Sequence, residues 1–217
     1  MADLFPTSFW DSELGEIPQG WRVSAIGEQA TAILGGTPAR AEPAFWGGTI
    51  PWINSGKAND FRVMEPTEYI TELGMASSAT KLLPRRTTII AITGATLGQV
   101  SMTEIATCAN QSVVGVLGSA TMPSEYLYCW VKQNIGRLIA RQTGGAQQHI
   151  NKNDVCDLPL LLPPRPLLDA FHNAASPLFD RIANALTEAS SIASLLDALL
   201  PRLLSGTLSL RDARSPS

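Results

Sequence analysis

The stretch that decides the fold is LLDAFHNAASPLFDRIANALTEASSIASLLDALLPRLL, residues 167–204. Its apolar side chains recur in alternating steps of three and four, the a/d heptad spacing that buries one edge of a helix against another helix. This stripe consists of Leu168, Phe171, Ala175, Leu178, Ile182, Ala185, Ala189, Ile192, Leu196, Leu199 and Leu203. No upstream segment shows a stripe of comparable length, so we predict a long coiled-coil helix that docks onto another chain. The alternative is a helix folded back onto its own domain.

The expected limits of this helix follow from its capping residues. We expect a short helix over 167–175, and then a main helix with Ser176 as N-cap and Pro177 in its first turn. Gly206 is the expected residue after its end, and Pro201 should distort the helix or end it early because it lacks a backbone N–H. The main helix would be about 40 Å long, slightly more than one turn of duplex DNA, about 34–36 Å. Further leucines widen its apolar face beyond a two-stranded seam and favour a bundle with more helices: Leu186, Leu195, Leu200 and Leu204.

Length and composition predict a soluble protein with one compact domain and an appendage. The chain has 217 residues, of which 45% are apolar, enough for a folded core. Three widely spaced cysteines suggest neither a disulfide framework nor a metal clamp and fit a reducing cytoplasm. The N-terminus lacks the pattern of a signal peptide, and no run is long enough for a membrane span.

Charge is unevenly distributed along the chain, whose net charge is −3. Residues 1–34 hold one basic and five acidic side chains (−4), residues 35–152 hold ten and seven (+3), and residues 153–217 hold five and seven (−2). A basic middle segment is compatible with a polyanionic partner that contacts this segment alone, although the distribution can also arise by chance.

The segment before the long helix predicts a loop-rich α+β domain. The Pro- and Gly-containing turn at residues 15–21 marks the expected start of the domain, after an N-terminal arm. Residues 125–139 show a clear helical period, and the Pro-terminated stretch 158–166 should close the domain as an extended strand. Short β-like runs with turn signals between them occupy residues 49–53, 87–93, 99–103 and 112–117.

Catalytic and metal-binding patterns are missing from the sequence. His149 and His172 are the two histidines, and neither lies at a spacing typical of zinc ligands. Pairing His149 with Cys156 as base and nucleophile is only formal. Three glycine-containing segments, 35–38, 94–98 and 144–148, fit no phosphate-loop spacing and are interpreted as tight turns. Their Thr and Gln side chains nevertheless suit base edges and phosphates. We therefore expect no catalysis, no cofactor and no metal.

A series of short motifs runs along nearly the whole chain. They are, in order, GEIPQGW (15–21), GGTP (35–38), FW (45–46), IPWI (50–53), KLLP (81–84), GATLG (94–98), NQ (110–111), YL (126–127), a Gly-rich turn before INK (150–152), LPLLLPP (158–164) and LLPRLLSG (199–206). Each motif is weak alone, but their order and spacing are specific, and together they resemble the specificity subunit of type I restriction-modification enzymes.

The resemblance implies a non-catalytic, double-stranded DNA-binding target-recognition domain at residues 1–164. It also implies a coiled-coil helical region at 165–217 that spaces recognition domains and docks modification (methyltransferase) subunits, and through them a restriction subunit. The usual subunit carries two recognition domains and two helical regions, whereas this chain has one of each. It is therefore either a half-length subunit that forms a homodimer, reading a bipartite palindromic target, or a fragment. A second departure lies at residues 167–169, where family members often have Glu-Gln.

The expected contacts divide into three sets. Phosphate contacts are expected from Arg40, Lys57, Arg62, Lys81, Arg85, Arg86 and Lys152. Candidates for base edges are Thr37, Asn59, Thr96, Gln111, Gln147 and Gln148, although such side chains also serve purely structural turns. The dimer interface is expected to use Leu178, Ile182, Ala185, Ala189, Ile192, Leu196, Leu199 and Leu203.

Two alternatives stay open at this point. A coiled-coil assembly module would use the helix and ignore DNA, and a carbohydrate-binding module would use aromatic and amide-rich loops. Four aromatic residues are either core side chains, which we favour, or stacking platforms for flipped bases: Trp21, Phe45, Trp46 and Trp52.

Overall fold

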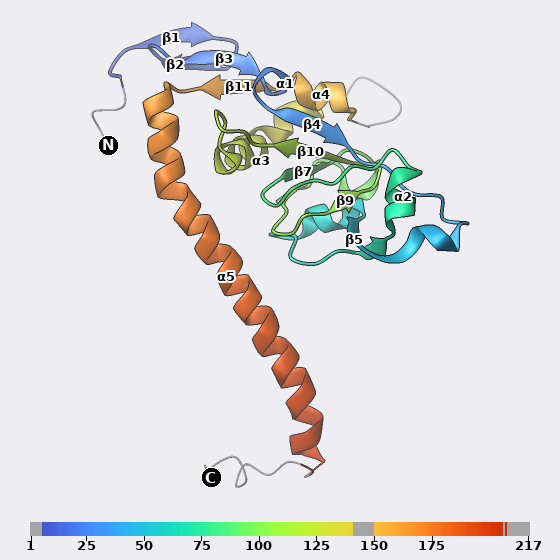
Figure 1. Cartoon of the computed structure of the whole chain (residues 1–217). Helices are drawn as coiled ribbons and strands as arrows, with labels where there is room; N and C mark the ends of the chain where they lie inside the picture. The colour runs from blue at the N-terminus through green and yellow to red at the C-terminus, as the bar shows by residue number, and fades with distance from the viewer. Residues whose placement is uncertain (1–5, 141–149, 206, 208–217) are drawn as a thin grey trace. The chain divides into compact units, whose positions relative to one another are not determined.

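A computed structural model describes residues 6–140, 150–205 and 207 (Figure 1). The chain divides into two compact units, Met1–Pro177 and Leu178–Ser217. The first unit is a mixed α+β domain, which confirms the predicted fold class. The boundary predicted between residues 164 and 165 coincides with the start of the long helix α5 (Arg165–Leu204). The first turns of α5 belong to the first unit, which extends to Pro177.

The main sheet of the first unit has four strands in the order β4–β10–β7–β8, and every neighbouring pair is antiparallel. Its central strand β10 (Val113–Leu117) is almost entirely buried, as expected for a β-branched run covered on both faces. Around it lie β4 (Thr31–Leu34), β7 (Thr88–Ala91) and β8 (Val100–Met102). The predicted β-like runs at 87–93, 99–103 and 112–117 therefore form three of these strands.

A second sheet packs against the first and has the strand order β6–β5–β9. The predicted run at 49–53 is the end of its central strand β5 (Trp46–Ile53), which pairs antiparallel with β6 (Glu68–Ile70) and parallel with β9 (Cys108–Ala109). One buried cluster joins the two sheets through side chains such as Ile53, Ile89 and Val113. The sheets are therefore held by a common apolar core.

Short helical elements connect these strands. They are η2 (Pro43–Phe45), η3 (Ser55–Asn59), α2 (Glu72–Ala76) and η4 (Gly94–Thr96). Asn54 caps η3 with its side chain and Thr71 caps α2 in the same way, because such side chains accept from the unpaired backbone N–H groups of a first turn. The GATLG segment thus forms a helical turn, as its glycines suggested.

Helix α3 and the chain ends complete the first unit. The helix predicted at 125–139 is α3 (Ser124–Ala140). Strand β11 (Pro159–Leu162) pairs antiparallel with β3 (Arg22–Ala25), so two segments far apart in sequence lie side by side (Figure 1). Trp130 Nε1 donates to the Pro159 carbonyl at 2.8 Å, which ties α3 to this small sheet.

The region around this small sheet holds two short helices and a hairpin. Helices α1 (Ile26–Gln29) and α4 (Lys152–Cys156) are in contact. In the described part of the expected N-terminal arm, β1 (Phe9–Ser12) pairs with β2 (Gly15–Pro18) as an antiparallel hairpin.

Helix α5 begins earlier than predicted and is continuous. Pro166, rather than Pro177, lies in its first turn, where a missing backbone N–H has no intrahelical role. The expected break at Ser176 is wrong, and the helix also continues past Pro201 to Leu204. Packing explains the early start, because Leu168 is buried and the Phe171 ring meets Tyr126 edge-on at 5.7 Å. The first residues of the predicted stripe are therefore used within the first unit.

The second unit contributes the rest of α5. From residue 178 onward the helix exposes a series of large apolar side chains, each between 38% and 81% exposed. These are Leu178, Ile192, Leu195, Leu196, Leu199, Leu200 and Leu204. Of the other predicted interface residues, Ala185 and Ala189 are exposed, and Ile182 and Leu203 are half-buried.

Candidate nucleic-acid interface

Four loops of the first unit meet at one end of its sheets. Because β4 and β7 both run antiparallel to β10, their carboxyl ends lie beside the start of β10. The end of β5 joins them, since Asn110 N donates to the Ile53 carbonyl at 2.9 Å. The loop after β5 forms η3, which contacts η4 in the loop after β7.

Uncharged polar side chains gather on these loops. We call this set the polar edge: Thr37, Asn59, Thr93, Thr96, Gln111 and Ser112. The four described base-edge candidates thus come together. Gln147 and Gln148, with His149, lie outside the described residues. Ile150, which follows them, donates its backbone N–H to the Ile92 carbonyl at 2.9 Å.

The loop that carries Thr37 is held by close backbone contacts. Gly35 N donates to the Val113 carbonyl at 3.0 Å, and Gly36 N donates to the Ala109 carbonyl at 2.8 Å. A Cβ on Gly35 would lie 2.1 Å from the carbonyl oxygen of Asn110, so a larger residue would force the two loops apart. These two glycines therefore allow a close approach that fixes the loop after β4 against the loop before β10.

Thr37 and Gln111 join these two loops through their side chains. The Thr37 hydroxyl donates to Gln111 Oε1, a hydrogen bond between residues 74 positions apart in sequence. Thr37 is half-buried and Gln111 is exposed. Among the residues that the structure describes, none accepts a hydrogen bond from Gln111 Nε2. The amide therefore presents its NH₂ group outward.

The other members of the polar edge are also partly ordered by hydrogen bonds. Thr93 Oγ1 donates to Ser112 Oγ at 2.7 Å, and Thr96 Oγ1 donates to the Thr93 carbonyl at 3.5 Å. Asn59 Nδ2 donates to the Gly56 carbonyl within η3 at 3.1 Å. The sequence prediction missed Thr93 and Ser112, although both directly flank motifs that it had singled out, GATLG and NQ.

Basic residues predicted to contact phosphate fall into two groups. Those with exposed or half-exposed side chains are Arg40, Lys57, Lys81, Arg85 and Lys152. Lys57 Nζ lies 3.2 Å from Asp60, and Arg40 lies 2.7 Å from Glu68 while its guanidinium stacks 3.7 Å from the Trp46 ring centroid. No ion pair involves Lys81 or Lys152 within the described part of the chain.

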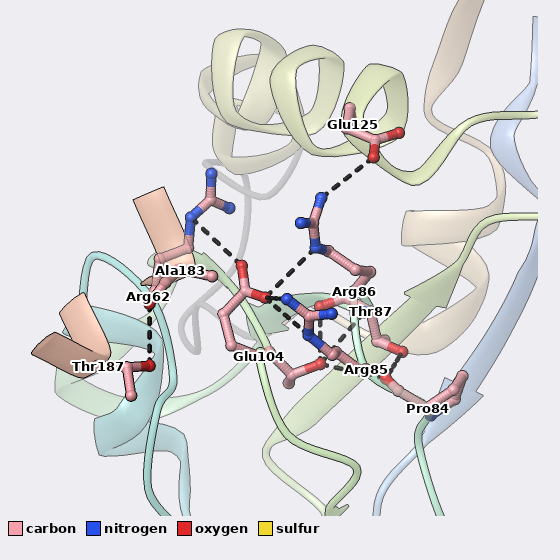
Figure 2. A network of polar contacts seen from close by, with 10 residues as sticks. Arg62, Pro84, Arg85, Arg86, Thr87, Glu104, Glu125, Ala183 and Thr187 are labelled. Atoms are coloured by element: carbon pink, nitrogen blue, oxygen red, sulfur yellow. Dashed lines mark hydrogen bonds and ion pairs between the residues drawn. The ribbon is translucent and has the colours of Figure 1, made fainter. Parts of the chain in front are cut away.

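Arg62 and Arg86 belong to the second group and lie inside the domain. Figure 2 shows them around Glu104, whose side chain is 2% exposed. Arg86 Nε lies 3.3 Å and Arg62 Nε 3.9 Å from the Glu104 carboxylate, and half-exposed Arg85 reaches it at 3.1 Å. We call these four residues the Glu104 cluster. Their placement leaves the phosphate role predicted for Arg62 and Arg86 without support, because both guanidiniums face an internal carboxylate.

The Glu104 cluster extends to α3 and α5. Arg86 Nη1 lies 3.1 Å from Glu125, and the second oxygen of Glu125 lies 3.1 Å from His172 Nδ1. Arg86 also has a positive φ of 68°, an uncommon conformation for a residue with a side chain. Burial lowers the pKa of the Arg62 guanidinium, whereas the facing Tyr128 and Glu104 groups act in the opposite direction. Ion pairs with Glu104 and Glu125 inside the domain therefore explain why Arg62 and Arg86 are placed there.

The four aromatic residues lie mainly in the core. Trp21 and Trp52 are buried, and Phe45 and Trp46 are half-buried. Trp52 Nε1 donates to the Gly36 carbonyl at 3.1 Å, so this ring supports the loop that carries Thr37.

Among the described residues, we find no group of three or more His, Cys, Asp and Glu side chains placed to hold a metal. None of the described helices has both the length and the apolar content to cross a bilayer.

Sequence comparisons link the chain to DNA specificity proteins. A family model described as type I restriction modification DNA specificity domain matches residues 18–167. The type I restriction enzyme MjaIX specificity subunit of Methanocaldococcus jannaschii is 24% identical over 202 residues, covering 91% of this chain and 46% of the relative. The HindI specificity subunit of Haemophilus influenzae is 24% identical over 196 residues, covering 88% and 42%. The chain thus spans less than half the length of either relative.

Solved structures show the same fold. The HsdS subunit from Thermoanaerobacter tengcongensis superimposes with a TM-score of 0.56 at 19% identity, over 95% of this chain and 49% of that one. The S subunit of a type I restriction-modification system from M. genitalium gives a TM-score of 0.59 at 17% identity, over 86% and 46%.

Proposed function

Because the chain belongs to the type I restriction-modification DNA specificity family, we propose that its first unit recognises a DNA sequence through the polar edge and performs no catalysis itself. The observation that carries this proposal is the convergence of four loops whose polar side chains meet at one end of the sheets. Hydroxyl and amide groups are the donors and acceptors that read base edges in the grooves. A scaffold with rigid strands and polar loops is suited to presenting them.

The exposed basic residues would supply the sequence-independent part of the affinity. Lys81 and Lys152 have no acidic partner among the described residues, so their charges are available to phosphate oxygens. Lys57 and Arg85 would have to exchange an acidic partner for phosphate, and Arg40 is already stacked on Trp46. We therefore expect Lys81 and Lys152 to contribute most.

We further propose that the apolar stripe of the second unit pairs with the same stripe of a second copy as a coiled coil. Seven large apolar side chains are exposed along this part of α5. Four of them belong to the predicted a/d stripe, and stripes of this spacing are buried in helix pairs: Leu178, Ile192, Leu196 and Leu199. A two-fold dimer would present two recognition domains and therefore read a bipartite, palindromic target. Modification subunits, and through them a restriction subunit, would supply the chemistry.

A binding titration with the full chain tests the DNA role. Binding to duplex DNA should weaken steeply with salt, and replacing both Lys81 and Lys152 with Ala should reduce the slope of log K against log salt by about 1.8, at about 0.9 per lost phosphate contact. Arg22→Ala, an exposed residue on the β3–β11 sheet, is the matched control and should leave the slope unchanged. Absence of salt-dependent binding would favour an assembly or carbohydrate-binding module instead.

Sedimentation of the full chain tests the dimer. Replacing Ile192 and Leu196 with Asp should convert a dimer to a monomer, because each buried carboxylate would lose hydration without gaining a partner. Ser190→Asp and Ser194→Asp place the same charges on neighbouring exposed positions and should preserve the dimer. A wild-type chain that stays monomeric at high concentration would exclude the pairing.

A further inference from the structure

Resting on the proposed function, we infer that Gln111 reads a keto oxygen, guanine O6 or thymine O4, in the major groove, and that Thr37 is the positioning residue that orients it. The inference begins with the hydrogen bond between these two side chains. Because the Thr37 hydroxyl donates to Gln111 Oε1, the oxygen of the amide is turned toward Thr37. The exposed end is the NH₂ group, which can only donate.

Both residues stand on backbone that cannot easily move. Thr37 follows two glycines whose added Cβ atoms would lie within 2.1 Å and 2.5 Å of neighbouring backbone atoms. Gln111 lies between Asn110, whose backbone N–H is bonded to Ile53, and Ser112, whose carbonyl accepts from Ile92 at 2.9 Å. The amide is thus fixed at its base by the turn and at its oxygen by Thr37. Such preorganisation is what a discriminating contact requires.

A fixed orientation has consequences for base reading but not for phosphate binding. A freely rotating amide can turn either its oxygen or its nitrogen toward a base, and would accept keto and amino groups alike. A phosphate oxygen only accepts, so a free amide would meet it equally well without Thr37. The polar edge around Gln111 is also uncharged, which favours base edges over phosphate. The geometry therefore points to a base contact.

The donor character of Gln111 determines which base it prefers. In the major groove every base pair carries one keto oxygen and one amino group, and they lie on opposite strands. An outward NH₂ donates to guanine O6 or thymine O4. The amino groups at cytosine N4 and adenine N6 are themselves donors, so they cannot accept a hydrogen bond from it. At the keto/amino position of the base edge, as opposed to the N7 acceptor that guanine and adenine share, Gln111 would thus distinguish G or T from A or C at one position of one strand.

Selection from a randomised duplex pool, using the full chain, tests this assignment. Wild type should require G or T at one position by about tenfold, a figure of the size expected for one base contact. Gln111→Glu should reverse that position to C or A, because a carboxylate still accepts from Thr37 but presents an acceptor. Thr37→Val should abolish discrimination at this position, and Thr37→Ser, which keeps the hydroxyl, should restore it. Gln133→Glu on α3 adds the same charge at another exposed site and should keep the wild-type motif.

The outcomes separate this inference from the proposed function. If wild type selects a motif but Gln111→Glu weakens all sequences equally, Gln111 contacts phosphate and the inference is wrong while DNA recognition stands. If Thr37→Val leaves the motif unchanged, Thr37 does not orient the amide and the inference is wrong in the same way. If wild type selects no sequence at all, the proposed function itself is lost, and the inference with it.

Discussion

The Glu104 cluster and the polar edge belong to the same domain but place their polar side chains in opposite environments. In the cluster, two arginines that the sequence marked for DNA lie inside, within 3.3 Å and 3.9 Å of one buried carboxylate. At the polar edge, uncharged side chains lie on loops, bonded to one another in pairs. The charged residues hold the domain together, whereas the neutral ones are available to a ligand. Net charge along the sequence therefore does not locate the binding face.

Desolvation explains this division. A buried charge loses hydration that only a facing opposite charge can replace, so removing one partner leaves the others uncompensated. An exposed hydroxyl or amide keeps access to water and makes a small net contribution to folding. Substitutions in the two regions should accordingly differ in what they disturb: stability in the cluster, and recognition at the polar edge.

The largest effect is expected for Glu104→Gln. This change keeps the shape of the side chain but removes the charge facing Arg62 and Arg86, so the free energy of unfolding should fall by about 3–5 kcal/mol. Urea denaturation measures it. Glu68→Gln is the control, because Glu68 pairs with an exposed arginine and exposed pairs contribute about 1 kcal/mol or less. If both variants lost the same free energy of unfolding, burial would not make the Glu104 cluster more important for stability than an exposed ion pair.

A smaller loss of stability is expected for a substitution at Gly35, where the polar edge depends on close backbone packing. Gly35→Ala would place a methyl group 2.1 Å from the Asn110 carbonyl oxygen, and the required movement should cost about 1–3 kcal/mol. It should also separate Thr37 from Gln111 and weaken sequence discrimination. Thermal unfolding and DNA selection measure the two effects.

Gly136→Ala provides the contrast for this variant. Gly136 lies in α3 with nothing within 4 Å of its added Cβ, so alanine there should stabilise the domain by up to about 1 kcal/mol. A Gly35→Ala protein with unchanged stability would show that the two loops can separate freely, and the preorganisation of Thr37 and Gln111 would then have no structural basis.

Local patterns predicted the regular elements well. Helix α3 was identified because apolar residues recur at helical spacing over its whole length, and strands β7, β8 and β10 because short β-like runs alternate with turn signals. The same patterns failed where tertiary packing decides. The Ser176–Pro177 pair is a good helix start by itself, but burial of Leu168 and the contact between Phe171 and Tyr126 extend α5 upstream.

The candidate site was predicted less completely, since its contacts join residues far apart in sequence. The partners of Arg85 and Arg86 lie 19 and 39 residues away, and nothing near either arginine indicates them. Thr37 and Gln111 were each selected for their chemistry, but their hydrogen bond spans 74 residues and depends on the order of strands in the sheet. Residue type alone was enough to select the candidate site residues. Only the fold shows which of them lie inside the domain and which are exposed.

The smallest effect on stability, and the sharpest test of the comparison, is expected for Thr93→Val. Valine keeps the shape of threonine but removes the hydroxyl that donates to Ser112 Oγ at 2.7 Å, so unfolding should become easier by only about 0.5–1.5 kcal/mol. Thr49→Val, at an exposed position in β5, should change stability by less than about 0.5 kcal/mol. Affinity for the selected DNA should fall for Thr93→Val and not for Thr49→Val when both proteins are fully folded. If Thr93→Val destabilises the domain as strongly as Glu104→Gln and binds DNA normally once folded, the polar edge is a structural element like the Glu104 cluster, and the division between the two regions fails.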